Sequence, residues 1–198
     1  MFHPSQMSPA DTALLVIDVQ EKLVPLIRGA DALVRNIAFL LDAAHLVRVP
    51  VLATEQYPRG LGPTVAALRQ HLPERPDKVG FSCCAVPSLV EQLRRGGRAK
   101  VLLAGIETHV CVLQTGLDLL AQGFQVAVAA DAVAGRFALD HDLALRRLER
   151  AGAVLTTAET AVFEWVGTAA APAFKAVSAL VQERARRLSE LASPETPQ

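Results

Sequence analysis

The chain has 198 residues, 51% of them hydrophobic, and 20 Lys and Arg residues balance 20 Asp and Glu residues. This length suits one domain, so we predict a single domain over residues 1–192 and a flexible polar tail over 193–198. The charge balance argues against a nucleic-acid partner or an anionic membrane surface, and no apolar run approaches the ~20 residues that span a bilayer.

Short apolar runs alternate with helical patterns along the chain. The predicted strands cover residues 13–17, 49–54, 77–79, 101–105, 124–130 and 153–155. The predicted helices cover residues 32–47, 64–72, 87–95, 109–122, 139–150, 158–166 and 172–190. This alternation predicts an α/β fold of three layers, a doubly wound, Rossmann-like sheet of about six parallel strands with helices on both faces.

Two charged residues and a cysteine stand at the ends of predicted strands, at the positions where ligands of such folds bind. Asp18 follows the first apolar strand, where a carboxylate needs a partner unless it only caps the next short helix. The chain has only four lysines against sixteen arginines, so lysine is not its usual surface cation, and the compact charge of Lys78 would suit a thiolate or carboxylate. The ordinary alternative is a solvated lysine in a loop. Because these strands end at one edge of the sheet, Asp18, Lys78 and Cys111 can share one pocket.

Cys111 lies in the first turn of a helix directly after a buried strand. There the helix dipole and free backbone N–H groups favour a thiolate, the form that acts as a nucleophile. The ordinary alternative is a small buried hydrophobic residue. We expect the amides around Ile106-Glu107 to line an oxyanion hole, and His109 to lie in a pocket wall or interface. Cys83 and Cys84 are expected to be unreactive.

The remaining motif searches exclude several classes of site. Three cysteines, two of them adjacent, give neither a disulfide framework nor a zinc pattern, so we expect a reducing cytoplasm. The N-terminus lacks the pattern of a signal peptide. The scattered histidines favour no metal, and the absence of Gly-x-Gly-x-x-Gly and Walker sequences disfavours a nucleotide, so we predict no cofactor. No Gly-x-Ser-x-Gly elbow is present, which disfavours a serine hydrolase.

Five segments in order resemble those of the isochorismatase-like cysteine hydrolase superfamily. The similarity is greatest to its metal-free branch of isochorismatase-domain-containing proteins and extends from about residue 12 to 165. The segments are Leu15-Val16-Ile17-Asp18-Val19-Gln20, Thr54-Glu55-Gln56, Lys78-Val79-Gly80-Phe81-Ser82, Gly105 through Cys111, and Asp131-Ala132-Val133.

This resemblance implies a catalytic triad and a pocket. Asp18 would be the general base, Lys78 would stabilise the charged pair, and Cys111 would form an acyl-enzyme. The resemblance also implies a non-proline cis peptide at Ile106-Glu107, which would turn backbone N–H groups, including that of Cys111, toward an oxyanion. The implied substrate-pocket residues are Gln56, Tyr57, Phe81, Glu107 and Thr108.

Two departures from related enzymes narrow the expected reaction. Nicotinamidase relatives carry a metal-binding Asp-x-His segment where this chain has residues 55–60, and isochorismate-cleaving members lack the nucleophilic cysteine. We therefore expect hydrolysis of a non-peptide C–N bond in a small amide-like substrate, by a homo-oligomer (dimer, tetramer or larger). The alternatives are a redox- or electrophile-reactive thiol protein, and an oligomeric scaffold with little turnover.

Overall fold

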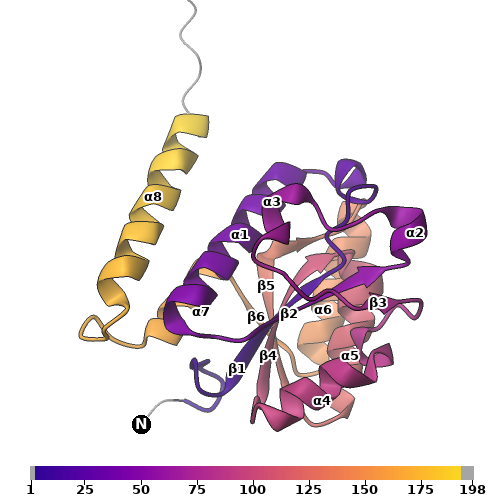
Figure 1. The fold of residues 1–198 in the computed structure, drawn as a ribbon, viewed down its shortest axis with the longest axis horizontal. Helices are drawn as coiled ribbons and strands as arrows, with labels where there is room; N and C mark the ends of the chain where they lie inside the picture. The colour runs from indigo at the N-terminus through magenta and orange to yellow at the C-terminus, as the bar shows by residue number, and fades with distance from the viewer. Residues whose placement is uncertain (1–2, 193–198) are drawn as a thin grey trace, which may run out of the picture.

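Six parallel strands form the middle layer of the molecule (Figure 1). The structure is a computed structural model that describes residues 3–192, with side chains as far as residue 190, so the predicted tail lies outside the described residues. The sheet order is β3-β2-β1-β4-β5-β6, which confirms the predicted fold class. The strands are β1 Thr12–Ile17, β2 Val51–Gln56, β3 Asp77–Lys78, β4 Lys100–Ile106, β5 Gln125–Ala134 and β6 Val154–Thr156.

Helices cover both faces of this sheet (Figure 1). One layer contains α1, α3 and α7, and the other contains α4, α5 and α6. The helices are α1 Ala30–Val47, α2 Pro58–Leu61, α3 Ala66–Arg69, α4 Pro87–Arg95, α5 Leu113–Ala121, α6 Ala138–Arg150, α7 Ala158–Val166 and α8 Phe174–Ala192. Two 3-10 turns, η1 Val24–Leu26 and η2 Cys83–Ala85, and one π-helical turn, η3 Thr108–Val112, complete the fold.

The central strands are apolar throughout because both of their faces are covered. All six residues of β1 are buried, with Leu14 and Val16 in the α1–α7 core and Leu15 and Ile17 in the α4–α6 core. Successive side chains of a strand point to opposite faces, so one continuous apolar run supplies both cores. At the polar end of this run stands Asp18.

Several element boundaries differ from the predicted ones. The expected helix over 64–72 is reduced to α3, and the expected helix over 109–122 begins with the π-helical turn η3 before α5. The short helix α2 was not predicted. β5 extends to Ala134, beyond the predicted end at residue 130, and its register with β4 shifts between Leu103 and Gly105.

Helix α8 lies at one side of the molecule, next to α1 and α7 (Figure 1). Val177 is its fully buried anchor in the α1–α7 core. Within residues 3–192, no helix is long and apolar enough to cross a membrane.

Gly105 allows β4 to lie unusually close to β1. Its φ is +120°, a value that favours glycine, and a Cβ there would lie 2.1 Å from the carbonyl oxygen of Ile17. Since the atoms of Ile17 that this Cβ would meet all belong to the backbone, they cannot move away as a flexible side chain would. Gly105 therefore sets the spacing between β1 and β4 one residue before Asp18.

We predict that Gly105→Ala destabilises the fold much more than Gly123→Ala. Gly123 also has a positive φ, but a Cβ there would meet open space, so its substitution should cost only about 1–2 kcal/mol. Gly105→Ala adds a backbone clash and should cost at least twice as much. Chemical denaturation of both variants tests this expectation, and equal losses would show that β1 and β4 tolerate separation.

Candidate active site

Asp18, Lys78 and Cys111 meet where the strand order reverses. Asp18 follows β1, Lys78 ends β3 and Cys111 lies in the turn after β4. The Lys78 ammonium nitrogen is 2.7 Å from Asp18 Oδ2, and the charges of both residues act on the Cys111 thiol. All three side chains are at least nine-tenths buried. Such switch points are the usual binding crevices of doubly wound sheets.

Lys78 is held by acceptors on several sides. Besides its ion pair with Asp18, the ammonium donates three hydrogen bonds. They go to Gln56 Oε1 at 2.6 Å, to the Phe81 carbonyl oxygen at 2.8 Å and to the Gly80 carbonyl oxygen at 3.3 Å. Burial alone would lower the pKa of Lys78, but the Asp18 carboxylate more than reverses this, so the net pKa is raised. An ammonium has three protons, and these neighbours occupy them. Lys78 therefore acts on Cys111 through its charge.

Asp18 is oriented by β2 as well as by Lys78. Its Oδ1 accepts a 2.8 Å hydrogen bond from the Thr54 hydroxyl, which lies next to Ile17 in the β1–β2 register. The backbone of Asp18 has a φ of 52°, a left-handed value that Asp tolerates better than most residues. Its carboxylate caps no helix in the described residues, so the capping alternative does not describe its contacts.

Cys111 lies in the π-helical turn η3 with its side chain buried. Burial raises the pKa of the Cys111 thiol, and the Asp18 charge and hydrogen-bond acceptor raise it further, while Lys78 opposes both. The sequence led us to expect an easily ionised thiol at a helix start. In the structure, burial and Asp18 raise the pKa of this thiol, which is opposite to that expectation.

The junction before η3 is fixed by side chains from the β5–α6 connection. The Ile106-Glu107 peptide bond is cis. The buried Glu107 carboxylate accepts hydrogen bonds from the Arg136 backbone N–H at 3.0 Å and from its Nε at 3.1 Å. The Thr108 hydroxyl is 2.9 Å from His141 Nδ1. Glu107 and Thr108 are therefore engaged in supporting the junction.

The other expected pocket residues divide into one buried and two exposed side chains. The Gln56 amide donates to the Val79 carbonyl oxygen at 2.7 Å while its Oε1 receives Lys78, so Gln56 supports the lysine. Tyr57 and Phe81 are 56% and 52% exposed. They follow β2 and β3 and are free to contact a ligand that approaches this edge.

Neither His109 nor the acidic residues near it form a second centre. His109 Nε2 is 4.0 Å from Asp140 Oδ2 on α6, and the ring lies against Gly135. In the part of the chain that the structure describes, no three His, Cys, Asp or Glu side chains gather in a way that could hold a metal ion.

Sequence reasoning missed four supporting residues of the site: Thr54, Cys83, Thr115 and Arg136. Cys83 Sγ is 3.3 Å from Thr54 Oγ1, and the Cys83 backbone N–H donates to Thr115 Oγ1 at 2.9 Å. A signal was present for Thr54, since a polar residue at the end of β2 must lie beside the end of β1. Nothing in the local sequence marks Cys83 or Thr115.

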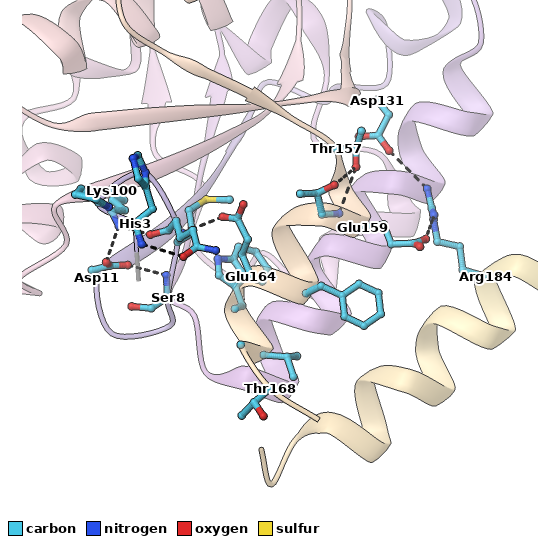
Figure 2. A pocket seen from close by; sticks show the side chains of 18 residues that line it. His3, Ser8, Asp11, Lys100, Asp131, Thr157, Glu159, Glu164, Thr168 and Arg184 are labelled. Carbon is cyan, nitrogen blue, oxygen red and sulfur yellow. Dashed lines mark hydrogen bonds and ion pairs between the residues drawn. The ribbon is translucent and has the colours of Figure 1, made fainter. Parts of the chain in front are cut away.

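A large hollow of about 1160 Å³ lies away from this site, between the N-terminal segment, α7 and α8 (Figure 2). Four of the charged groups that line it are paired, Lys100 with Asp11 at 3.0 Å and Arg184 with Asp131 at 3.6 Å. Figure 2 shows these two pairs on opposite sides of the hollow. Its size alone would favour this hollow as the active site. The buried ion pair beside a thiol, however, lies at the carboxyl ends of the central strands.

Comparisons with known proteins agree with this architecture. The human isochorismatase domain-containing protein 2 is 41% identical over 178 residues, which cover 89% of this chain and 86% of that protein. The solved structure of the MAR1 ribonuclease from Caenorhabditis elegans is 41% identical, covers 89% of this chain and 92% of its own, and has a TM-score of 0.85. YcaC from Pseudomonas aeruginosa, solved with hexane-2,5-diol and covalent acrylamide, is 25% identical over 98% of this chain and all of its own, with a TM-score of 0.84.

The family model named isochorismatase domain matches residues 12–160. This match spans β1 through the first residues of α7 and includes the segments that carry Asp18, Lys78 and Cys111. The chain therefore belongs to the isochorismatase family.

Proposed function

We propose that this protein is a cysteine hydrolase that cleaves a non-peptide C–N bond in a small amide-like substrate. Membership of the family supports a hydrolase role. The observation that carries the cysteine mechanism is the buried Asp18–Lys78 ion pair beside the Cys111 thiol. A carboxylate within reach of a neutral thiol is the arrangement that general-base activation of a nucleophile requires.

The reaction begins with proton transfer from Cys111 to Asp18. As the thiol sulfur bonds to the substrate carbonyl carbon, its proton passes to the carboxylate, and Lys78 balances the negative charge that remains in the site. Because the pKa of Cys111 is raised, the thiolate exists only while it attacks, so little of it is exposed to other electrophiles at rest.

The tetrahedral intermediate then needs hydrogen-bond donors for its oxyanion. Among the backbone N–H groups of η3, those of Val110 and Val112 donate to the Glu107 carbonyl oxygen, and that of Cys111 is suited to this role because the first turn of a helix leaves N–H groups without intrahelical partners. Collapse breaks the C–N bond, and the departing nitrogen takes the proton from Asp18. Asp18 then deprotonates a water molecule, whose attack on the thioester releases the acid and restores the thiol.

Two features support a small substrate. Cys111 is 6% exposed, so the reacting carbon must enter a narrow space, and the exposed Tyr57 and Phe81 offer aromatic contacts at the strand ends. The related YcaC protein was solved with covalent acrylamide, which is itself a small amide and an electrophile. The Pseudomonas protein therefore reacts with a molecule of this size.

RNA is the second substrate class to test, because the solved relative from Caenorhabditis elegans is named a ribonuclease. The formal net charge of zero gives this chain no general attraction for a phosphate backbone, which favours the small amide. A cytoplasmic location and a homo-oligomer stay predictions, and sedimentation of the purified chain measures the subunit number.

The raised pKa of Cys111 predicts how its alkylation depends on pH. With iodoacetamide, we expect the rate at Cys111 to be a small fraction at pH 7 of its value at pH 10, because burial and Asp18 hold the pKa of this thiol above its ordinary value and the thiolate fraction grows as the pH rises. Peptide mass spectrometry separates Cys111 from the other thiols. A rate already maximal at pH 7 and flat above it would indicate a stored thiolate and contradict this resting state.

Removal of the nucleophile or base should abolish amide hydrolysis. In a screen of small amides, carbamoyl compounds and imides, we expect Cys111→Ser and Asp18→Asn to lower kcat/KM by about 10²–10⁴-fold for any substrate found. Asp140→Asn, which alters an exposed carboxylate near His109, is the matched control and should retain the rate. RNA cleavage that survives Cys111→Ser would contradict a cysteine mechanism for that substrate.

Chelation should leave hydrolysis unchanged. Lys78 already balances the charge of Asp18, and a thiol nucleophile needs no metal to generate it. We expect the same kcat/KM before and after dialysis against EDTA. A fall in kcat/KM of more than about tenfold, reversed by added zinc, would overturn this prediction. Such a fall would mean that at least about 1.4 kcal/mol of the lowering of the activation barrier depends on a metal.

A further inference from the structure

We propose that Cys83 is a positioning residue for Asp18: its S–H donates to the Thr54 hydroxyl and thereby directs the Thr54 proton onto the Asp18 carboxylate. The inference takes from the proposed function the role of Asp18 as proton acceptor. It assigns a purpose to a second buried thiol that the mechanism does not use.

The four residues form a continuous chain between α5 and β1. The Cys83 backbone N–H donates to Thr115 Oγ1 at 2.9 Å, Cys83 Sγ is 3.3 Å from Thr54 Oγ1, and Thr54 Oγ1 is 2.8 Å from Asp18 Oδ1. Each of the four side chains is at most 1% exposed. Water therefore cannot replace a missing partner, and the direction of each hydrogen bond is determined within the chain.

The direction follows from the number of protons. An ionised carboxylate can only accept, so the single hydroxyl proton of Thr54 goes to Asp18. Thr54 then has only lone pairs to offer Cys83, and the proton between sulfur and oxygen must come from the thiol. If Cys83 lost its proton, Thr54 would be drawn between two anions.

Cys83 keeps this proton over the working range of pH. Burial and the Asp18 charge raise the pKa of Cys83, hydrogen bonds with Thr115 and Thr54 and the charge of Lys78 lower it, and the net pKa is about 12. The residue is thus a permanent donor and a poor nucleophile. It lies in the same apolar core as Cys111, so α5 and η2 hold it in place.

The functional consequence falls on Asp18. A hydroxyl that donates to Oδ1 stabilises the ionised carboxylate, and an incoming bond from Cys83 strengthens that donor. Because the thiol of Cys111 is hard to ionise, its attack depends on a carboxylate that is both ionised and correctly oriented. Cys83 supports this state without contact with substrate.

The test is the rate at which iodoacetamide alkylates Cys111 at pH 7, where little free thiolate is present and the thiol proton passes to Asp18 as the sulfur attacks. Peptide mass spectrometry follows this rate in a Cys84→Ser background. We expect Cys83→Ala and Thr54→Val each to lower the rate by about 3–10-fold, the effect of one hydrogen bond. Because Cys83 acts through Thr54, the double variant should be no slower than Thr54→Val alone. Cys83→Ser, which restores a donor, should recover the rate to within about twofold.

Val86→Ala is the control for packing, since it removes side-chain volume from the same core without touching the chain of hydrogen bonds. Its rate should equal that of the background variant. A normal rate in Cys83→Ala, multiplying effects in the double variant, or an equal loss in Val86→Ala would each overturn the proposal.

Infrared spectroscopy provides a second test that needs no reaction. With Cys83 as the only thiol, in a Cys84→Ser, Cys111→Ser chain, its S–H band should lie below that of a free thiol and rise in Thr54→Val. An unshifted band would show that Cys83 is not a donor. Neither test uses amide turnover, so failure to hydrolyse any amide would contradict the proposed function and leave this inference to its own results.

Discussion

The buried ion pair between Asp18 and Lys78 is the interaction on which the candidate site depends. Removing two charges from water costs several kcal/mol per ion, and their attraction offsets this only with good geometry and further hydrogen bonds. The structure places the charged atoms 2.7 Å apart, and Gln56 and Phe81 accept hydrogen bonds from Lys78 while Thr54 donates one to Asp18 Oδ1. The ends of β1, β2 and β3 are thus organised around one pair of charges.

That pair also shifts the pKa of the Cys111 thiol, the proposed nucleophile. Lys78 has its protons directed to oxygen acceptors, so it offers the sulfur charge without a hydrogen bond of its own. Burial and the Asp18 charge together raise the pKa of Cys111, and in the proposed mechanism the same carboxylate accepts the thiol proton. A thiol that reacts readily with oxidants needs a lowered pKa. The raised pKa of Cys111 therefore favours the proposed hydrolase over the redox alternative.

The layers, and the proximity of Asp18, Lys78 and Cys111, could be predicted because both depend on the pattern of whole segments. Apolar runs on both sides of helices imply a covered parallel sheet, and polar residues after such strands must meet at one edge. The same rule places Thr54 beside the end of β1, but it does not give the direction of its hydrogen bonds, and nothing in the local sequence links Cys83 to Thr54. The π-helical start of η3 and the reduced length of α3 likewise reflect tertiary packing more than local propensity.

The central claim is that the Cys111 sulfur becomes covalently acylated during turnover. The most direct measurement is acid quenching of the enzyme with a hydrolysed amide, followed by intact-mass and peptide mass spectrometry. We expect a mass increase equal to the acyl part, located on the peptide that contains Cys111 and absent from Cys111→Ser. Hydrolysis that proceeds at the full rate in Cys111→Ser, or an adduct located on Cys83 or Cys84, would contradict it.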